Sequence, residues 1–198
     1  LSDKKADFLI PDYQRPYAWS EEQCQTLWDD IFLFSFPDNN YEAFDDNEEY
    51  FLGSIVTYKN ENGKSKVIDG QQRLTTLMLM LRAFYDKFES MKDKNSILTR
   101  DRIEKCIWKT DTFGTADKNT LKIDSEVATD NDKDEFLDLL RTGVVKKGSK
   151  SQYVLNYQFF QKKIDDFLQE FPSFFPYLPA RILSNCILLP IEAESQDT

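Results

Sequence analysis

A strand that runs through a glycine turn into a long apolar helix is the feature that most constrains this fold. Residues 64–68 form a β-type run, Asp69-Gly70 follows, and the stretch from Leu74 to Phe88 is apolar on most faces. A helix that is apolar nearly all round is buried. The sequence therefore predicts a strand–turn–helix unit at the centre of the core.

Further strands are predicted around this unit. Residues 51–58 are apolar and β-rich, and the segment 60–63, Asn-Glu-Asn-Gly, joins them to the run 64–68. Asn and Gly tolerate positive φ, so this segment predicts a β-hairpin. Residues 8–10 read as a short strand that ends at Pro11, and residues 187–191 as a last strand.

Helices are indicated by caps and by apolar spacing. Ser20 is a good N-cap with Gln23 three residues on, and the helix that it begins is ended by Pro37. Further helices are predicted over 100–108, 132–140, 153–170 and 176–185, with loops at 38–49 and 143–151. We predict an α+β fold, with an α/β core over residues 1–92 and a mostly helical extension over 93–198.

Composition excludes several classes of function. Lys and Arg number 25 and Asp and Glu 35, a net charge of −10, so a DNA duplex repels the chain unless its cations gather on one face. No histidine is present, which excludes a Ser-His-Asp triad and an HNH-type nuclease centre within the chain.

Three separated cysteines indicate reduced core thiols, not a zinc site. No apolar run approaches the roughly 20 residues of a membrane span, so we expect a cytoplasmic chain without membrane contact.

The turn at residues 69–73, Asp-Gly-Gln-Gln-Arg, is the strongest candidate for chemistry. The first turn of a helix offers unpaired N–H groups and the positive end of the helix dipole, so it suits a phosphate. Gly70 permits close approach, and Arg73 offers a planar fork to phosphate oxygens. Asp69 can cap the helix, hold a divalent cation or align a water, and Gln71 and Gln72 can orient a water or read sugar and base edges. The alternative is an ordinary strand-to-helix turn with solvated amides.

A second candidate is the segment 11–19, Pro-Asp-Tyr-Gln-Arg-Pro-Tyr-Ala-Trp, here called the arm. Pro11 and Pro16 stiffen it, so Arg15 is held on a rigid support, and its aromatic residues can stack on a base or a guanidinium. The alternative is aromatic core with Arg15 paired to a carboxylate. Gly53 hints at close approach by backbone or ligand, and Ser54 can donate to a phosphate. The acidic run 45–49 can be a metal site or a solvated loop.

Three stretches together resemble a known family: Ile-Pro-Asp-Tyr-Gln-Arg-Pro-Tyr-Ala-Trp at 10–19, Phe-Leu-Gly-Ser-Ile-Val at 51–56, and Asp-Gly-Gln-Gln-Arg-Leu-Thr-Thr-Leu at 69–77. Their order and spacing are similar to those of the domain of unknown function 262, the GmrS part of GmrS/GmrD-type restriction and phage-defence proteins. Asn156-Tyr157 with Phe159-Phe160 also resembles that family's helical region.

The resemblance implies a small mixed sheet of ParB/sulfiredoxin type with a helical extension. It further implies binding of a nucleoside triphosphate and its hydrolysis with Mg²⁺, in a domain that gates a nuclease. Asp69, Gln71, Gln72 and Arg73 inherit the catalytic role, and Asp69 is the candidate metal ligand. Nucleotide contacts are expected from Arg15, Gln14, Tyr13, Ser54 and Gly70.

Two rival functions stay open on the sequence alone. One is a sensor of DNA modification without turnover, in which a flipped base sits among Tyr13, Tyr17 and Trp19. The other is a scaffold for protein interactions. Because the family's later helices are missing after Thr198 and no initiator Met is present, we expect a fragment whose nuclease partner and DNA contacts lie on other parts.

Overall fold

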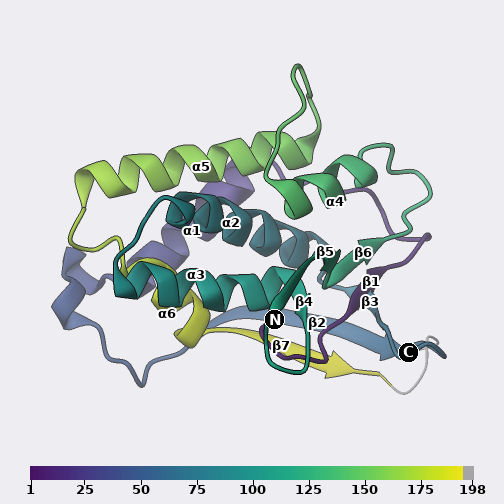
Figure 1. The fold of residues 1–198 in the computed structure, drawn as a ribbon, viewed down its shortest axis with the longest axis horizontal. Coiled ribbons are helices and arrows are strands. Elements are labelled where there is room, and N and C mark those ends of the chain that lie inside the picture. Colours follow the sequence, from purple (N-terminus) through teal and green to yellow (C-terminus); the bar gives the residue numbers. More distant parts are fainter. Residues whose placement is uncertain (194–198) are drawn as a thin grey trace.

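The computed structural model describes residues 1–193 as a mixed α/β fold (Figure 1). Its α-helices are α1 (Glu21–Ser35), α2 (Gln71–Glu89), α3 (Lys94–Ile107), α4 (Lys133–Thr142), α5 (Gln152–Glu170) and α6 (Tyr177–Asn185). Its strands are β1 (Phe8–Ile10), β2 (Tyr50–Lys59), β3 (Ser65–Asp69), β4 (Trp108–Thr110), β5 (Ala116–Leu121), β6 (Ile123–Ser125) and β7 (Cys186–Glu192). Two short 3-10 helices, η1 (Pro37–Asn39) and η2 (Tyr41–Ala43), lie in the loop after α1.

Five strands form one mixed sheet in the order β6-β1-β3-β2-β7. The pair β2 and β3 is antiparallel, and the other neighbours are parallel. In Figure 1, β2 and β7 run along the lower side with the helices stacked above them. The strands β4 and β5 form a separate antiparallel pair. The α+β class predicted from the sequence is confirmed.

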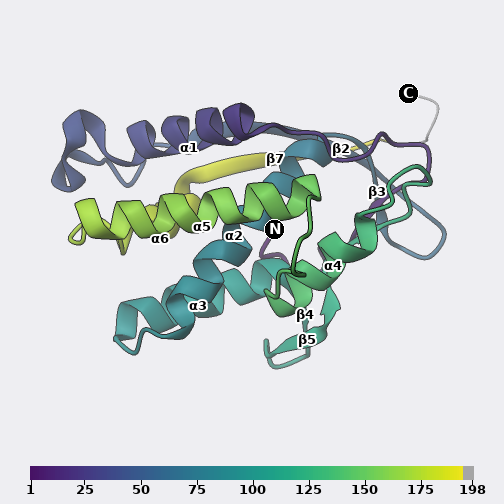
Figure 2. The same ribbon diagram turned by 90° about the horizontal axis from the view of Figure 1, so that it is seen from above.

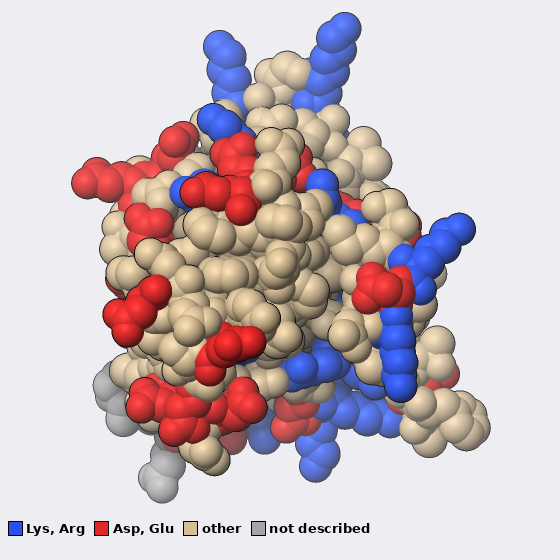
Figure 3. Space-filling model, turned by 90° about the vertical axis from the view of Figure 1, so that its left-hand side faces the viewer, with Lys and Arg blue, Asp and Glu red and all other residues tan. Residues whose placement is uncertain are grey.

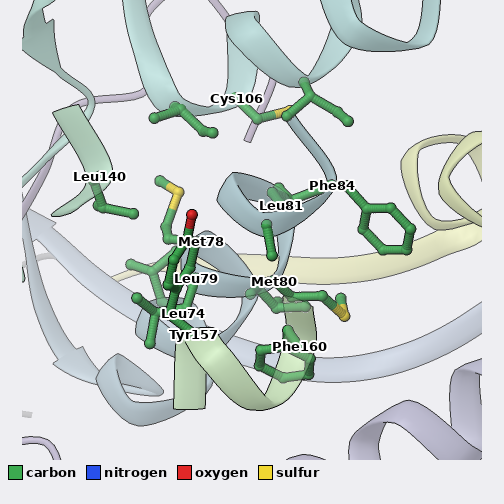
Figure 4. Close-up of a cluster of buried hydrophobic side chains, with 14 of the residues drawn as sticks. Leu74, Met78, Leu79, Met80, Leu81, Phe84, Cys106, Leu140, Tyr157 and Phe160 are labelled. Atoms are coloured by element: carbon green, nitrogen blue, oxygen red, sulfur yellow. The ribbon is translucent and has the colours of Figure 1, made fainter. Parts of the chain in front are cut away.

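Helix α2 is the centre of the core, as predicted. Fourteen of its nineteen residues are buried, and it lies between α3 and α5 (Figure 2). Figure 4 shows its side chains, among them Met78 and Phe84, in one cluster with Cys106 of α3 and Phe160 of α5. Since α2 begins directly after β3, the core fixes where the 69–73 turn lies.

The predicted hairpin and the cap of α1 are both confirmed. Strands β2 and β3 meet through residues 60–64, and Asn60 Oδ1 accepts hydrogen bonds from the turn amides of Asn62 and Lys64. Ser20 and Gln23 form the complete capping box, in which each side chain accepts from the other residue's backbone N–H. Helix α3 begins earlier than predicted, because Asp93 caps it by accepting from Ser96 N at 3.0 Å.

The region 108–125 differs from the mostly helical expectation, because it holds β4, β5 and β6. Asp111 Oδ1 accepts from the N–H groups of Phe113 and Thr115, which closes a tight turn between β4 and β5. Strand β5 has the sequence Ala-Asp-Lys-Asn-Thr-Leu, which lacks the apolar residues that mark a strand. In this region the turn residues around Asp111 indicate the β4–β5 hairpin more clearly than the strand residues do.

The division at residue 92 and the ParB-type relationship stay predictions. Strands β6 and β7, which belong to the segment 93–198, complete both edges of the sheet. The buried core is also continuous across residue 92, since α2 packs on both α3 and α5.

Two buried arginines organise the packing of the helices. Arg181 of α6 donates to the carbonyls of Ser35 and Tyr41, with its guanidinium 4.0 Å from the Phe44 ring centre. Arg82 of α2 pairs with Asp86 at 2.9 Å. Both arginines therefore have fixed partners inside the fold.

The cysteines are free thiols, in line with the predicted core role. Cys24 and Cys106 are buried and Cys186 is half-buried. Burial raises the pKa of Cys24 to about 11 and that of Cys186 to about 12. These thiols are therefore protonated at neutral pH.

A separate search for membrane spans found none among the helices of residues 1–193: each is too short or too polar to cross a bilayer.

Strand β7 ends the sheet at one edge, and Pro190 lies in it. Ala193 N donates to Thr57 O, so Ala193 faces β2. Because parallel-strand residues alternate in the direction of their hydrogen bonds, Pro190 faces the free edge. That edge therefore lacks one N–H donor.

Replacing the cap of α1 tests the local energetics. We expect Ser20→Ala to lower the free energy of unfolding by about 1 kcal/mol, because the Gln23 N–H loses its acceptor, Ser20 Oγ. Ser20→Asp is the matched control and should retain stability, since Asp caps equally well and favours the helix dipole. Urea unfolding followed by circular dichroism measures both. Equal losses for Ala and Asp would contradict the capping account.

Candidate functional site at the start of α2

Gly70 joins β3 to α2 in a left-handed conformation with φ of 89°. A Cβ atom at this position would lie 2.7 Å from the carbonyl oxygen of Ser54 on β2. Both the positive φ and this close approach require glycine. The turn is therefore pressed against β2, which brings Ser54 next to the start of α2.

The first turn of α2 has no cap. No side chain accepts from it, and the N–H groups of Gln71, Gln72 and Arg73 have no acceptor among residues 1–193. These N–H groups have no intrahelical partner, and they carry the positive end of the helix dipole. An anion at this point would accept hydrogen bonds from these N–H groups, which have no acceptor among residues 1–193.

Arg73 lies half-buried against Gly53 of β2. A Cβ atom on Gly53 would lie 2.4 Å from Arg73 Nη1 and 2.6 Å from its Cζ. Gly53 has φ of 130° and coincides with a shift of register between β2 and β7, which is typical of a bulge. The close approach inferred for Gly53 is thus made by the Arg73 side chain.

The guanidinium of Arg73 has no hydrogen-bond or ion-pair partner within the described part of the chain. Half-buried arginines ordinarily bind a carboxylate or carbonyl, as Arg82 and Arg181 do here. Arg73 therefore has its donors available for a ligand.

Asp69 is the exposed last residue of β3, and it caps nothing. Among the described residues there is no group of three acidic or sulfur ligands that could hold a metal ion by themselves. Mg²⁺ is ordinarily bound through one or two carboxylates together with substrate phosphates. A single carboxylate beside a phosphate position fits that mode. The acidic run 45–49 takes the alternative form, that of a solvated loop.

Gln71 and Gln72 hold the arm. Gln71 Nε2 donates to Gln14 Oε1 at 2.9 Å, and Gln14 Nε2 donates to the Ile68 carbonyl at 2.8 Å. Gln72 Oε1 accepts from Ala18 N at 2.8 Å, and its Nε2 donates to Pro16 O at 3.1 Å. Both glutamines are buried. Gln72 thus uses both atoms of its amide on the arm, whereas Gln71 bonds to the arm through its Nε2.

These bonds place Arg15 between two anchors on the first turn of α2. Arg15 itself is exposed and has no hydrogen-bond or ion-pair partner among residues 1–193, so the alternative of a carboxylate pair is not seen. Tyr13 is 52% exposed, which leaves its ring accessible. The arm therefore brings Tyr13, Gln14 and Arg15 to the same turn as Asp69 and Arg73.

Tyr17 belongs to the core. Its ring stacks on Tyr153 of α5 at 4.8 Å between centroids, and its hydroxyl bonds to Thr76 Oγ1 at 2.8 Å. Burial raises the pKa of Tyr17 well above its usual value. The aromatic set for a flipped base thus loses one of its three rings, while Trp19 is half-buried.

Sequence reasoning found the two segments of the site and missed what connects them. Thr76 and Asn156 both contact Tyr17, and neither was assigned a part in the site. The signal available was Asn156-Tyr157 in the family resemblance, but no spacing rule links α5 to the arm. Ser54 lies beside the turn as expected, although its hydroxyl makes no bond within residues 1–193.

Charge on the surface is dispersed. Figure 3 shows one end of the molecule, where acidic side chains surround a largely neutral centre and basic ones stay in separate groups near the edges. With a net charge of −10, this face offers no continuous track for a DNA backbone.

The fold and the turn define a mixed α/β domain whose central helix presents an uncapped start beside Arg73, which is bonded to no other side chain of the described residues. The chain belongs to the family described as the N-terminal domain of the GmrSD restriction endonuclease, which it matches over residues 1–198. This membership connects the chain with restriction systems and thus with phage defence. A search of curated proteins found no match.

Two glycines with left-handed φ make a matched pair for testing the turn. A Cβ at Gly63 meets nothing within 4 Å, whereas one at Gly70 meets the Ser54 carbonyl. We expect Gly63→Ala to lower the free energy of unfolding by about 1 kcal/mol through backbone strain alone. Gly70→Ala should cost about 2 kcal/mol more, because the turn must move off β2. Denaturant unfolding measures both free energies. Equal losses in the two variants would show that the contact of Gly70 with β2 can relax to accept a Cβ atom.

Proposed function

We propose that this domain binds a nucleoside triphosphate at the start of α2, hydrolyses it with Mg²⁺, and so gates a nuclease that lies outside these residues. The observation that carries the proposal is the half-buried Arg73 guanidinium, which packs on Gly53 and has no partner within the described chain. An arginine held in this way is already oriented, so binding an anion costs little further ordering.

The phosphate groups would receive three kinds of donor. The uncapped N–H groups of α2 supply hydrogen bonds along the helix axis. Arg73 supplies a fork from the side of β2, and Arg15 supplies a mobile cation from the arm. Two guanidinium groups and a helix dipole outweigh the one carboxylate of Asp69, so the local balance favours an anion even though the whole chain is acidic.

Asp69 is the proposed metal ligand. A Mg²⁺ ion held there would supply positive charge against the charge that develops on the phosphate oxygens during phosphoryl transfer. Asp69 would hold this ion or align the attacking water, since its carboxylate is exposed and has no bonding partner among residues 1–193. Gln72 bonds to the arm through both atoms of its amide, so we assign it to positioning Arg15. Gln71 holds Gln14 through its Nε2, and we assign its Oε1 to aligning the water together with Asp69.

The nuclease is assigned to another part because the chain has no histidine. An HNH-type centre needs this residue, and the family name contains an endonuclease. Nucleotide binding or turnover in this domain would then act as the control input.

Removing the Arg73 guanidinium tests the site. Arg73→Ala should lower nucleotide affinity by about 1.5–3 kcal/mol, the scale of a hydrogen bond to a charged group, or roughly 10- to 150-fold. Isothermal calorimetry with each of the four nucleoside triphosphates, with and without Mg²⁺, gives the affinities. Arg141→Ala is the matched control, because Arg141 pairs with Asp138 on α4 and should leave binding unchanged.

Gly53→Ala separates the position of the charge from its presence. The added Cβ would displace the Arg73 fork while the charge remains, so affinity should fall in this variant too. If Arg73→Ala and Gly53→Ala both bound nucleotide with wild-type affinity, the proposed site at the start of α2 would be wrong.

Asp69→Asn tests turnover. The substitution keeps the shape of the side chain and removes its charge, so we expect phosphate release in the presence of Mg²⁺ to fall at least about 100-fold. Binding without Mg²⁺ should be retained or strengthened, because a negative charge beside the phosphates is lost. A phosphate-release assay and calorimetry provide the two readouts. Normal release from the variant would assign the metal and water to other groups.

A further inference from the structure

The arm is held by hydrogen bonds from two helices, α2 on one side and α5 on the other. Gln71 and Gln72 hold residues 14, 16 and 18 from the α2 side. The other side is the first part of α5, which lies 137 or more residues further along the chain. The support of Arg15 therefore depends on two elements that are far apart in sequence.

Asn156 makes the contact from α5. It is 1% exposed, and its Nδ2 donates to Tyr17 Oη at 2.8 Å and to Trp19 O at 2.8 Å. Its Oδ1 accepts from Gln152 Nε2 at 3.0 Å. Both N–H groups of the amide are thus used on the arm.

The same contact continues into α2. Tyr17 Oη bonds to Thr76 Oγ1 at 2.8 Å, and Thr76 Oγ1 donates to the Gln72 carbonyl at 2.9 Å. Buried polar groups in such a chain are costly to leave unpaired, so the arm, α2 and α5 hold one arrangement together.

We propose that α5 sets the phosphate affinity of the site through Asn156, a positioning residue that fixes the arm and thereby Arg15. The inference rests on the proposed function. Arg15 touches the phosphates, and Asn156 acts only through it. A shift of the first turn of α5 would release Tyr17 and the Trp19 carbonyl, and the Arg15 contact would weaken while the Arg73 contact stayed.

Three variants separate donation from packing. Asn156→Ala removes both donors. Asn156→Asp keeps the shape and turns a carboxylate oxygen toward the Trp19 carbonyl, so it should harm binding at least as much. Gln152→Ala removes the bond to Oδ1 and leaves the donors on the arm, so it serves as the matched control on the same helix.

A double-mutant cycle with Arg15→Ala tests the route, with Mg²⁺ and the best-binding nucleoside triphosphate as probe. Asn156→Ala alone should weaken binding about 5- to 10-fold, and Gln152→Ala less than about twofold. In the Arg15→Ala background, Asn156→Ala should cause no further loss, because the group that it positions is gone. In the Arg73→Ala background the loss should persist.

Other results would overturn the inference. An equal loss in the presence and absence of Arg15 would mean that Asn156 supports only the fold. Hydrogen exchange without nucleotide gives an independent reading: the Ala18 amide, which donates to Gln72, should exchange faster in Asn156→Ala. Unchanged exchange would also reject the clamp.

Failure of the proposed function is distinguishable from failure of the inference. If the wild-type domain binds no triphosphate, the proposed function fails and takes the inference with it. If the wild type binds, Arg73→Ala weakens binding and the Asn156 cycle is additive, only the inference fails.

Discussion

The close approach of Gly70 to the β2 backbone is the constraint on which the rest of the structure depends. It sets the position at which α2 leaves the sheet, and α2 supplies the central buried surface for α3 and α5. The same contact places Arg73 over Gly53 and Ser54 beside the turn. Packing and site therefore share one cause: Gly53 in β2 and Gly70 between β3 and α2 lack the side chains that would otherwise separate the helix from the sheet.

The arginines fall into two groups that differ in what they bind. Arg82 and Arg181 are buried and bonded to groups of the protein, so each stabilises packing between helices. Arg73 and Arg15 lack such partners within residues 1–193, although acidic side chains outnumber basic ones in the chain. Neither guanidinium is bonded to a carboxylate of residues 1–193, so both can donate to a bound anion. This contrast, more than the net charge, supports an anion at the start of α2.

Local signals predicted most of the fold, and they indicated the two segments that the structure brings together at the candidate site. The capping box of Ser20, the Asn-Gly hairpin and the apolar helix 74–88 act over a few residues, so the sequence alone indicates them. Strands β4 and β5 were not predicted, because their residues do not alternate between apolar and polar. The hydrogen-bond partners of Gln71 and Gln72 were not predicted for another reason. An amide side chain can bond to water, a base or backbone, and only the tertiary placement of the arm decides which of these it meets.

The edge of the sheet at β7 has a consequence for self-association. Pro190 faces outward from that edge, where an incoming strand would seek a continuous row of amide donors. The gap in this row weakens strand-on-strand addition at the middle of β7, although Leu189 and Ile191 on either side are apolar and exposed. Pro190 therefore makes this apolar edge a poorer template for pairing with a second strand than an ordinary residue would.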